Sequence, residues 1–248
     1  MRRAAGVLMM ALAGASIPAS AQSVAERVTA VRDGTVELVF RSRPTVCGDG
    51  SGGTWTRRGG DAGAWYGDRT CVRGPVRVRL GRSGGETASV RTCVACRPQS
   101  DAQVVETTPD DAARYLLSTA RAFGGRNADE AVTGAALADA QGEEPDFTRL
   151  VRDEAATMSA RKQALFWLGQ ITESTRSIVE LDGALRSPAL REQYTFVLSQ
   201  RRDEPAVDKL IDIARHDSDV NTRKKAMFWL GQMHDPKALQ FFKDALRP

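Results

Sequence analysis

Apolar and polar residues alternate in three short segments of the first hundred residues, at positions 34–43, 74–82 and 87–94. In the first segment, Val36, Leu38 and Phe40 occupy every second position. Successive side chains of a strand point to opposite faces, so these three side chains share one face of a β-strand. Gly84 and Gly85 separate the second and third segments and favour a hairpin turn. The pattern predicts a small antiparallel sheet, with one long Gly-rich loop between its first two strands.

From residue 107 onward the apolar positions recur with the period of a helix. Thr108-Pro109 is a capping residue followed by a proline at the first helical position. Asn127, with Glu130 three residues later, resembles a capping box. The predicted helices are 109–122, 127–140, 145–155, 160–171, 174–186, 188–200, 204–215, 220–232 and 235–247. Nine helices joined by short turns require an architecture in which helices pack on helices.

One stretch of the helical part is written almost twice: RKQALFWLGQ at 161–170 and RKKAMFWLGQ at 223–232 agree at eight of ten positions. A weaker third copy, REQYTFVLSQ, lies between them at 191–200, so the spacings are 30 and 32 residues. A repeat of this length containing two helices is typical of a solenoid, in which neighbouring helix pairs bury one another's apolar faces. The predicted fold class is therefore α+β, with a small disulfide-bonded antiparallel β domain at 22–106 and an α-solenoid at 107–248.

The last repeat carries a family resemblance. Its sequence from 217 to 246, DSDVNTRKKAMFWLGQMHDPKALQFFKDAL, contains an Asp-rich turn, an arginine, a Leu-Gly pair, an Asp-Pro turn and an apolar second helix. In chain order these features are the turn with Asp217 and Asp219, Arg223 with the small residue Ala226, Leu230-Gly231, Asp235-Pro236, and the apolar residues Ala238, Leu239, Phe242 and Leu246. In this order they resemble the HEAT-like repeat of the phycobilisome-lyase type, over 159–248 and more loosely over 127–155. The resemblance implies a solenoid of HEAT-like helical pairs that binds other proteins, and it implies no lyase activity.

The first 21 residues have the pattern of a cleaved secretory signal. Arg2 and Arg3 precede an apolar stretch, and Ala19-Ser20-Ala21 forms an A-x-A cleavage site. The apolar stretch of about 14 residues is shorter than the roughly 20 that a membrane-spanning helix needs. We therefore expect a periplasmic or secreted protein with no membrane span in the mature chain.

Loss of the signal also changes the charge balance. The chain has 35 Lys and Arg against 31 Asp and Glu, and removal of Arg2 and Arg3 leaves 33 against 31. A nearly neutral, exported chain lacks the basic character of a nucleic-acid-binding protein. The expected partner is another protein of the periplasm or cell envelope, and no nucleic acid.

The four cysteines are Cys47, Cys71, Cys93 and Cys96, all in the predicted β domain. An even number of cysteines in an exported domain predicts two disulfides. We favour Cys47–Cys71, which would hold the Gly-rich loop, and Cys93–Cys96, which would close locally. Two alternatives remain open: a redox-active Cys93/Cys96 pair, or a zinc site formed by all four cysteines.

Histidine is nearly absent, with His216 and His234 at predicted helix ends beside aspartates. No Gly-x-Ser-x-Gly, phosphate-loop or dinucleotide fingerprint occurs. The sequence therefore predicts no catalytic residue, no metal and no cofactor, and its best interpretation is a protein-binding scaffold rather than an enzyme. An alternative from another class is a thiol-disulfide oxidoreductase that uses Cys93 and Cys96. A third is a structural module without a ligand of its own.

Two series of residues recur in the three repeats and are candidate binding residues. The first series is Arg161, Arg191 and Arg223. It predicts either a docking stripe for acidic partners or, as the family resemblance implies, contacts to aspartates of the preceding turns, such as Asp153 and Asp219.

The second series is Phe166, Phe196 and Phe228. At about 100° per residue, Ala226 and Leu230 share one helix face while Phe228 points nearly opposite. Three rings stacked in register would form an apolar stripe, which is a contact surface if exposed. The alternative is that the rings pack on the sheet or on neighbouring helices.

Overall fold

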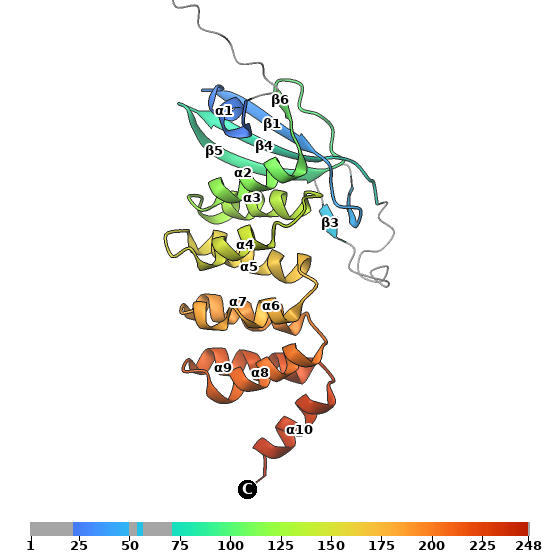
Figure 1. Cartoon of the computed structure of the whole chain (residues 1–248), viewed down its shortest axis with the longest axis vertical. Coiled ribbons are helices and arrows are strands. Elements are labelled where there is room, and N and C mark those ends of the chain that lie inside the picture. The colour runs from blue at the N-terminus through green and yellow to red at the C-terminus, as the bar shows by residue number, and fades with distance from the viewer. Residues whose placement is uncertain (1–21, 50–53, 57–70, 248) are drawn as a thin grey trace, which may run out of the picture.

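The computed structural model describes residues 22–49, 54–56 and 71–247. The predicted signal peptide and most of the Gly-rich loop lie outside the described residues. Within them the protein is mixed α+β, with a small sheet at one end followed by a tall stack of helices (Figure 1). This confirms the predicted α+β class, with a small sheet that is followed by helices.

The main sheet has four strands in the order β5-β4-β1-β6. They are β1 (Gly34–Phe40), β4 (Val76–Ser83), β5 (Glu86–Val94) and β6 (Gln103–Glu106). The three predicted strands are β1, β4 and β5, and they pair antiparallel, as expected. The fourth strand, β6, was not predicted and pairs parallel to β1. It is short, and Val105 alone among its residues is buried, so it has no readable alternation. A separate two-stranded ribbon joins β2 (Val46–Gly48) to β3 (Thr54–Thr56).

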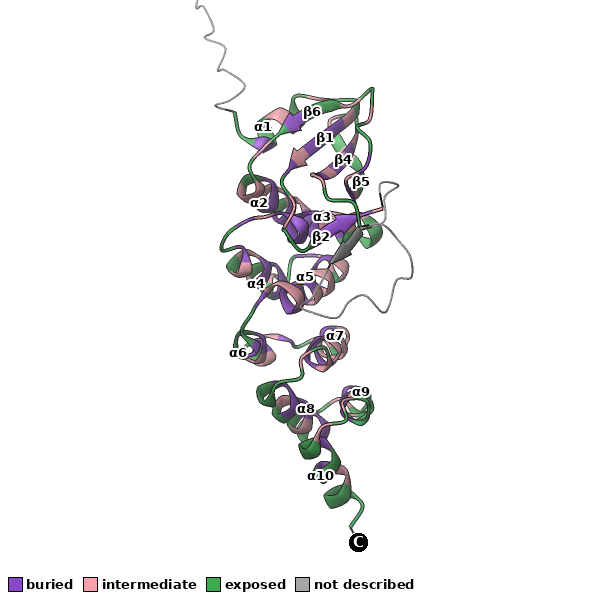
Figure 2. Cartoon of the chain, turned by 90° about the vertical axis from the view of Figure 1, so that its right-hand side faces the viewer, coloured by how far each residue is buried: buried purple, intermediate pink, exposed green. Residues whose placement is uncertain are grey.

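The described helices are α1 (Val24–Thr29), α2 (Pro109–Ala120), α3 (Gly125–Leu137), α4 (Glu144–Arg152), α5 (Met158–Ile171), α6 (Thr175–Val179), α7 (Pro188–Ser199), α8 (Glu204–His216), α9 (Val220–Gln232) and α10 (Pro236–Ala245). From α2 onward they form two rows, α2-α4-α6-α8-α10 and α3-α5-α7-α9 (Figure 2). The helix predicted at 174–186 is wrong in part, because it divides into α6 and a 3-10 turn at Asp182–Ala184. Gly183 weakens helical propensity there, and the Asp182 carboxylate is held by Arg191 and Lys209 instead. None of the described helices is long and apolar enough to span a membrane.

The apolar face of the sheet covers the first helix pair. Val36, Leu38 and Phe40 are buried, as their alternation predicts. Gly134 of α3 allows a close approach, because a Cβ at this position would lie 2.8 Å from Cγ2 of Val78. One continuous cluster of buried apolar residues therefore runs from the sheet into the helices.

The contacts of α3 with the sheet edge correct one prediction. Asn127 and Glu130 do not form a capping box, since α3 begins at Gly125 after an N-cap at Gly124. Their side chains accept hydrogen bonds from the backbone N–H groups of Val90 (3.1 Å) and Thr92 (2.8 Å) in β5. An edge strand presents unpaired N–H groups, so these side chains protect the edge and fix α3 on the sheet.

The opposite face of the sheet buries a charge. Glu37 of β1 is fully buried and accepts hydrogen bonds from Arg77 (2.6 Å) and Arg79 (2.9 Å) of β4. A buried carboxylate is tolerated where it is paired in this way. The neighbouring loop continues the network, because Arg79 also donates to the carbonyl oxygen of Arg97 (2.6 Å).

Candidate functional site

The repeated sequence forms α5, α7 and α9, which lie side by side in one row (Figure 1). Side-chain caps define two of the helix starts: Thr157 accepts from the Ala160 N–H at 3.3 Å, and Asp219 accepts from the Thr222 N–H at 2.7 Å. Ala226 and Leu230 are buried, as the helical spacing predicts. Corresponding residues of the three repeats therefore recur along one side of the stack.

Phe166 and Phe196 form the beginning of the expected aromatic stripe. Their rings stack with centroids 6.3 Å apart and planes 14° from parallel. The next ring is Trp229 rather than Phe228, at 5.4 Å from Phe196. Phe228 contacts Trp229 edge-on and is 55% exposed. The predicted in-register stack of three phenylalanines is therefore wrong at its last member.

The helical geometry explains why Trp229 takes the place that was expected for Phe228. The position after the repeated phenylalanine points toward the preceding helix, since Trp167 donates through Nε1 to Thr133 of α3 at 3.1 Å. Trp229 occupies the same position in α9 and points toward α7 in the same way. Phe228 lies about 100° around the helix from Trp229, so its side chain points away from α7 and is exposed. We call Phe166, Phe196 and Trp229 the aromatic stripe.

A hollow of about 380 Å³ lies beside the aromatic stripe. It is lined by Asp129, Ser159, Lys162, Gln163, Phe166 and Gln193. Burial raises the pKa of the Asp129 carboxyl, the neighbouring Glu130 adds to this, and Lys162 opposes it. An aromatic ring surrounded by amide, hydroxyl and charged groups suits contact with a polypeptide, which offers both apolar and hydrogen-bonding groups.

The repeated arginines hold turns within the chain. Arg161 is buried and donates through Nε to the carbonyl oxygen of Val151 at 3.0 Å. Arg223 donates to the carbonyl oxygen of Asp217 at 2.7 Å. Arg191 pairs with the carboxylates of Asp182 and Asp217. All three guanidinium groups thus make contacts inside the fold.

The aspartate partners proposed for Arg161 and Arg223 are wrong. Asp153 pairs with Arg121 at 3.0 Å, and Asp219 caps α9. A backbone carbonyl takes the place of the expected carboxylate in both repeats. The aspartate contact occurs in the middle repeat, where burial lowers the pKa of Arg191 and the two carboxylates more than offset it, so that the net shift is upward.

The cysteines are paired as expected, Cys47 with Cys71 and Cys93 with Cys96, at Cα separations of 5.3 and 6.0 Å. None of the four is free. Cys93 lies near the end of β5, and the chain from Cys96 to β6 contains no helix. Reactive Cys-x-x-Cys pairs are activated by a helix N-terminus. Here Arg79 lies beside Cys96, with its Nη2 3.9 Å from Sγ.

The two histidines have different hydrogen-bond partners. His216 Nδ1 is 3.0 Å from the Asp212 carboxylate, and His234 has a positive φ of 51° at the end of α9. In the part of the chain that the structure describes, no group of three or more His, Cys, Asp or Glu side chains could hold a metal ion.

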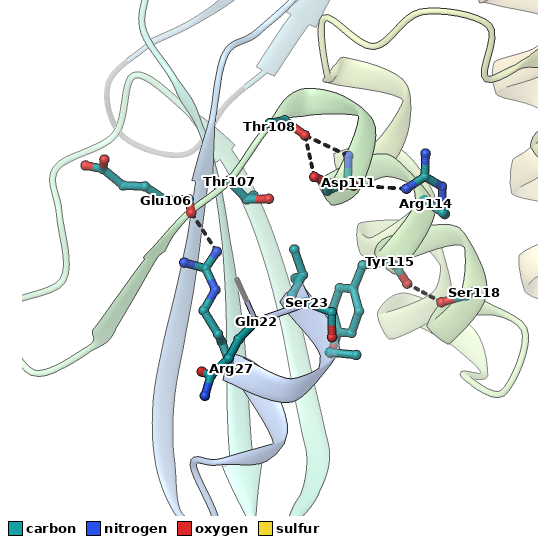
Figure 3. Close-up of a pocket in the computed structure, with 12 residues that line it drawn as sticks. Gln22, Ser23, Arg27, Glu106, Thr107, Thr108, Asp111, Arg114, Tyr115 and Ser118 are labelled. Carbon is teal, nitrogen blue, oxygen red and sulfur yellow. Dashed lines mark hydrogen bonds and ion pairs between the residues drawn. The ribbon is translucent and has the colours of Figure 1, made fainter. Parts of the chain in front are cut away.

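A larger hollow, about 700 Å³, lies between α1, β6 and the start of α2 (Figure 3). Several of its polar groups are hydrogen-bonded, although Nε of Arg27 is buried without a hydrogen-bond partner among the described residues. Arg27 donates to the Glu106 carbonyl at 2.6 Å, and Asp111 pairs with Arg114 at 2.9 Å. The aromatic stripe differs from this hollow in that corresponding positions of three successive repeat helices build it.

The stripe and its polar border form the candidate site on the geometry of the chain itself. No family model, no curated protein and no solved structure matches this chain.

Proposed function

We propose that this protein is an exported protein-binding scaffold. Its helical part, residues 107–248, would be an α-solenoid of HEAT-like repeats, and its sheet would cover the first repeat. The repeat spacings of 30 and 32 residues and the two rows of helices support this assignment. Export rests on the predicted signal peptide, and the partner would be a protein of the periplasm or cell envelope.

The aromatic stripe is the observation that carries the proposal. Phe166, Phe196 and Trp229 come from three successive helices of one row, are half-buried, and contact one another. Their buried sides fix the rings before a partner arrives, which lowers the entropic cost of binding. Their exposed sides are large aromatic surfaces, the type that dominates the energy of protein interfaces.

Binding fits these residues better than catalysis. The one hydroxyl side chain lining the hollow beside Phe166 is that of Ser159, which accepts a hydrogen bond from the Gly125 N–H at 3.1 Å. The lining contains neither histidine nor cysteine. A nucleophile hydrogen-bonded to a general base is the usual arrangement for covalent catalysis. Among the described residues, Ser159 has no hydrogen bond to Asp129, the carboxylate of this lining.

The test is capture of proteins from an envelope extract by the immobilised chain. The double variant Phe196→Ser/Trp229→Ser removes the stripe, and Ile211→Ser, a half-buried residue on α8 in the other row, is the control. We expect a retained protein to be lost with the double variant and kept with Ile211→Ser, with thermal melts showing that both variants fold. Equal capture by all three proteins would rule out the stripe as the binding surface.

A further inference from the structure

The near-identical helices α5 and α9 differ in what covers them. In α5, Leu165 is fully buried, and Gly169 receives Val197 of α7, because a Cβ on the glycine would lie 2.4 Å from Cγ1 of that valine. The ring of Phe166 stacks on that of Phe196, which also belongs to α7. Positions 165, 166 and 169 of α5 therefore form a seat for the next helix of the row.

The corresponding positions of α9 are Met227, Phe228 and Gly231, and all three are exposed. Met227 is 39% and Phe228 55% exposed. A Cβ on Gly231 would meet no atom within 4 Å. Since the two helices share eight of ten residues, α9 carries the same seat, and no described helix occupies it (Figure 2).

Helix α10 forms a wall beside this seat. It follows α8 in its own row, so the place opposite it, next in the row of α9, has no helix among the described residues. A hollow of about 410 Å³ lies there, lined by residues that include Leu230, Gly231, Leu239 and Phe242. Leu239 is 57% exposed. We call Met227, Phe228, Gly231, Leu239 and Phe242 the end seat.

Unpaired positive charge surrounds the end seat. Lys224 precedes Met227 and Phe228 by three and four residues, and Lys243 follows Leu239 by four, so both lie on the faces that form the seat. Lys225, which is also on α9, is exposed like these two lysines. None of the three has a salt bridge within the described part of the chain, whereas Lys237 pairs with Glu204 and Asp208. From 220 to 247 there are six basic residues and two acidic ones.

We propose that the end seat binds an amphipathic helix of another protein, one that carries acidic residues beside its apolar stripe. The occupant would dock as α7 docks on α5, with a branched aliphatic side chain against Gly231 and an aromatic ring on Phe228. Acidic flanks would pair with Lys224 and Lys243. A second copy of this chain fits less well, because two end seats would bring like charges together. The inference rests on the proposed protein-binding function and names a second surface and its partner chemistry.

The probe is a synthetic peptide with the sequence of residues 187–200, SPALREQYTFVLSQ, which contains the helix seated on α5. It is labelled and held helical by a staple on the face opposite Phe196. An acidic form carries Gln193→Glu and Gln200→Glu, which place carboxylates three or four residues from Phe196 and Val197. Fluorescence anisotropy with the full chain measures both affinities at low and high salt. We expect the acidic peptide to bind at least 5-fold more tightly than the parent, and salt to weaken it.

Two variants of the full chain locate the binding. Gly231→Leu places a side chain in the seat, at a position where an added Cβ meets no atom within 4 Å in the free protein. We expect at least a 10-fold loss of affinity, and Gln232→Leu, exposed on the same helix, is its control. Lys224→Glu/Lys243→Glu should remove the preference for the acidic peptide, while Arg186→Glu/Arg202→Glu, exposed elsewhere, should not. Thermal melts check that each variant folds.

Three outcomes would overturn the inference. These are failure of both peptides to bind, equal binding to Gly231→Leu, or occupation of the seat by another surface. The last would appear as concentration-dependent dimerisation, or as lysine-dependent binding to anionic phospholipid vesicles, abolished by Gly231→Leu. If the peptides fail while Phe196→Ser/Trp229→Ser still abolishes capture from the extract, the end seat alone is wrong. If that double variant leaves capture unaffected, the aromatic stripe is ruled out together with the end seat. If the unmodified chain itself retains no protein, the proposed function fails.

Discussion

Val197 of α7 packs so closely on Gly169 of α5 that a Cβ added to the glycine would lie 2.4 Å from the valine's Cγ1. The same glycine recurs as Gly231 in α9, where the added Cβ would meet nothing within 4 Å. Two glycines at corresponding positions of two repeats therefore differ in packing, one covered by a neighbouring helix and the other open, and this difference can be measured.

Gly169→Ala should destabilise the protein by about 1–3 kcal/mol, because it overpacks the contact between α5 and α7. Gly231→Ala should not destabilise it, and should stabilise it by up to about 1 kcal/mol, because alanine favours a helix. Urea denaturation curves of the two variants provide the comparison. A matching loss at both positions would mean that the face of α9 is covered in solution.

The aromatic residues should differ in their effect on folding. Phe228→Ser should change the free energy of unfolding by less than about 0.5 kcal/mol, as for an ordinary surface change. Leu230→Ala, one helix face away and buried, should cost about 2–5 kcal/mol. Phe196→Ser should fall between them, since its ring contacts two others and is half-buried. A Phe228 variant that melts as early as the Leu230 variant would place that ring in the core.

Glu37 should be among the most sensitive positions of the sheet. Glu37→Ala leaves Arg77 and Arg79 without their buried carboxylate, and breaking a buried pair costs about 3–5 kcal/mol. Glu86→Ala, exposed at the start of β5, is the matched control and should cost less than about 0.5 kcal/mol. Thermal melts monitored by circular dichroism decide this. A small effect at Glu37 would mean that the arginines find other partners.

Under oxidising conditions the native protein should contain no free thiol, as titration with a thiol reagent after denaturation would show.

Loss of Cys47–Cys71 should cost more stability than loss of Cys93–Cys96, because it closes a loop of 24 residues rather than three. In the chain-entropy model the longer loop contributes about 3 kcal/mol. Replacement of each pair by serine, followed by denaturation, compares them. The opposite order would show that Cys93–Cys96 has a larger role in holding β5.

Much of the local structure could be predicted from the sequence. Alternation placed Val36, Leu38 and Phe40 on the buried side of a strand, and Thr108-Pro109 marked the start of α2. The repeated decapeptide indicated that α5 and α9 play the same part in the fold. Period, capping and repetition act within one element or between identical elements, so a single sequence contains them.

Contacts between different elements were decided by the tertiary structure. Trp229 rather than Phe228 continues the aromatic stripe, and Arg223 finds the Asp217 carbonyl instead of a carboxylate. Asn127 binds the edge of β5 rather than its own helix end. Each outcome depends on how far one element is rotated and shifted against another, and that arrangement is set by the packing of the whole core. The exposure of Gly231 could not be predicted from the sequence for the same reason. The residues around it in the chain are almost those around the covered Gly169, and only the packing of other helices distinguishes the two glycines.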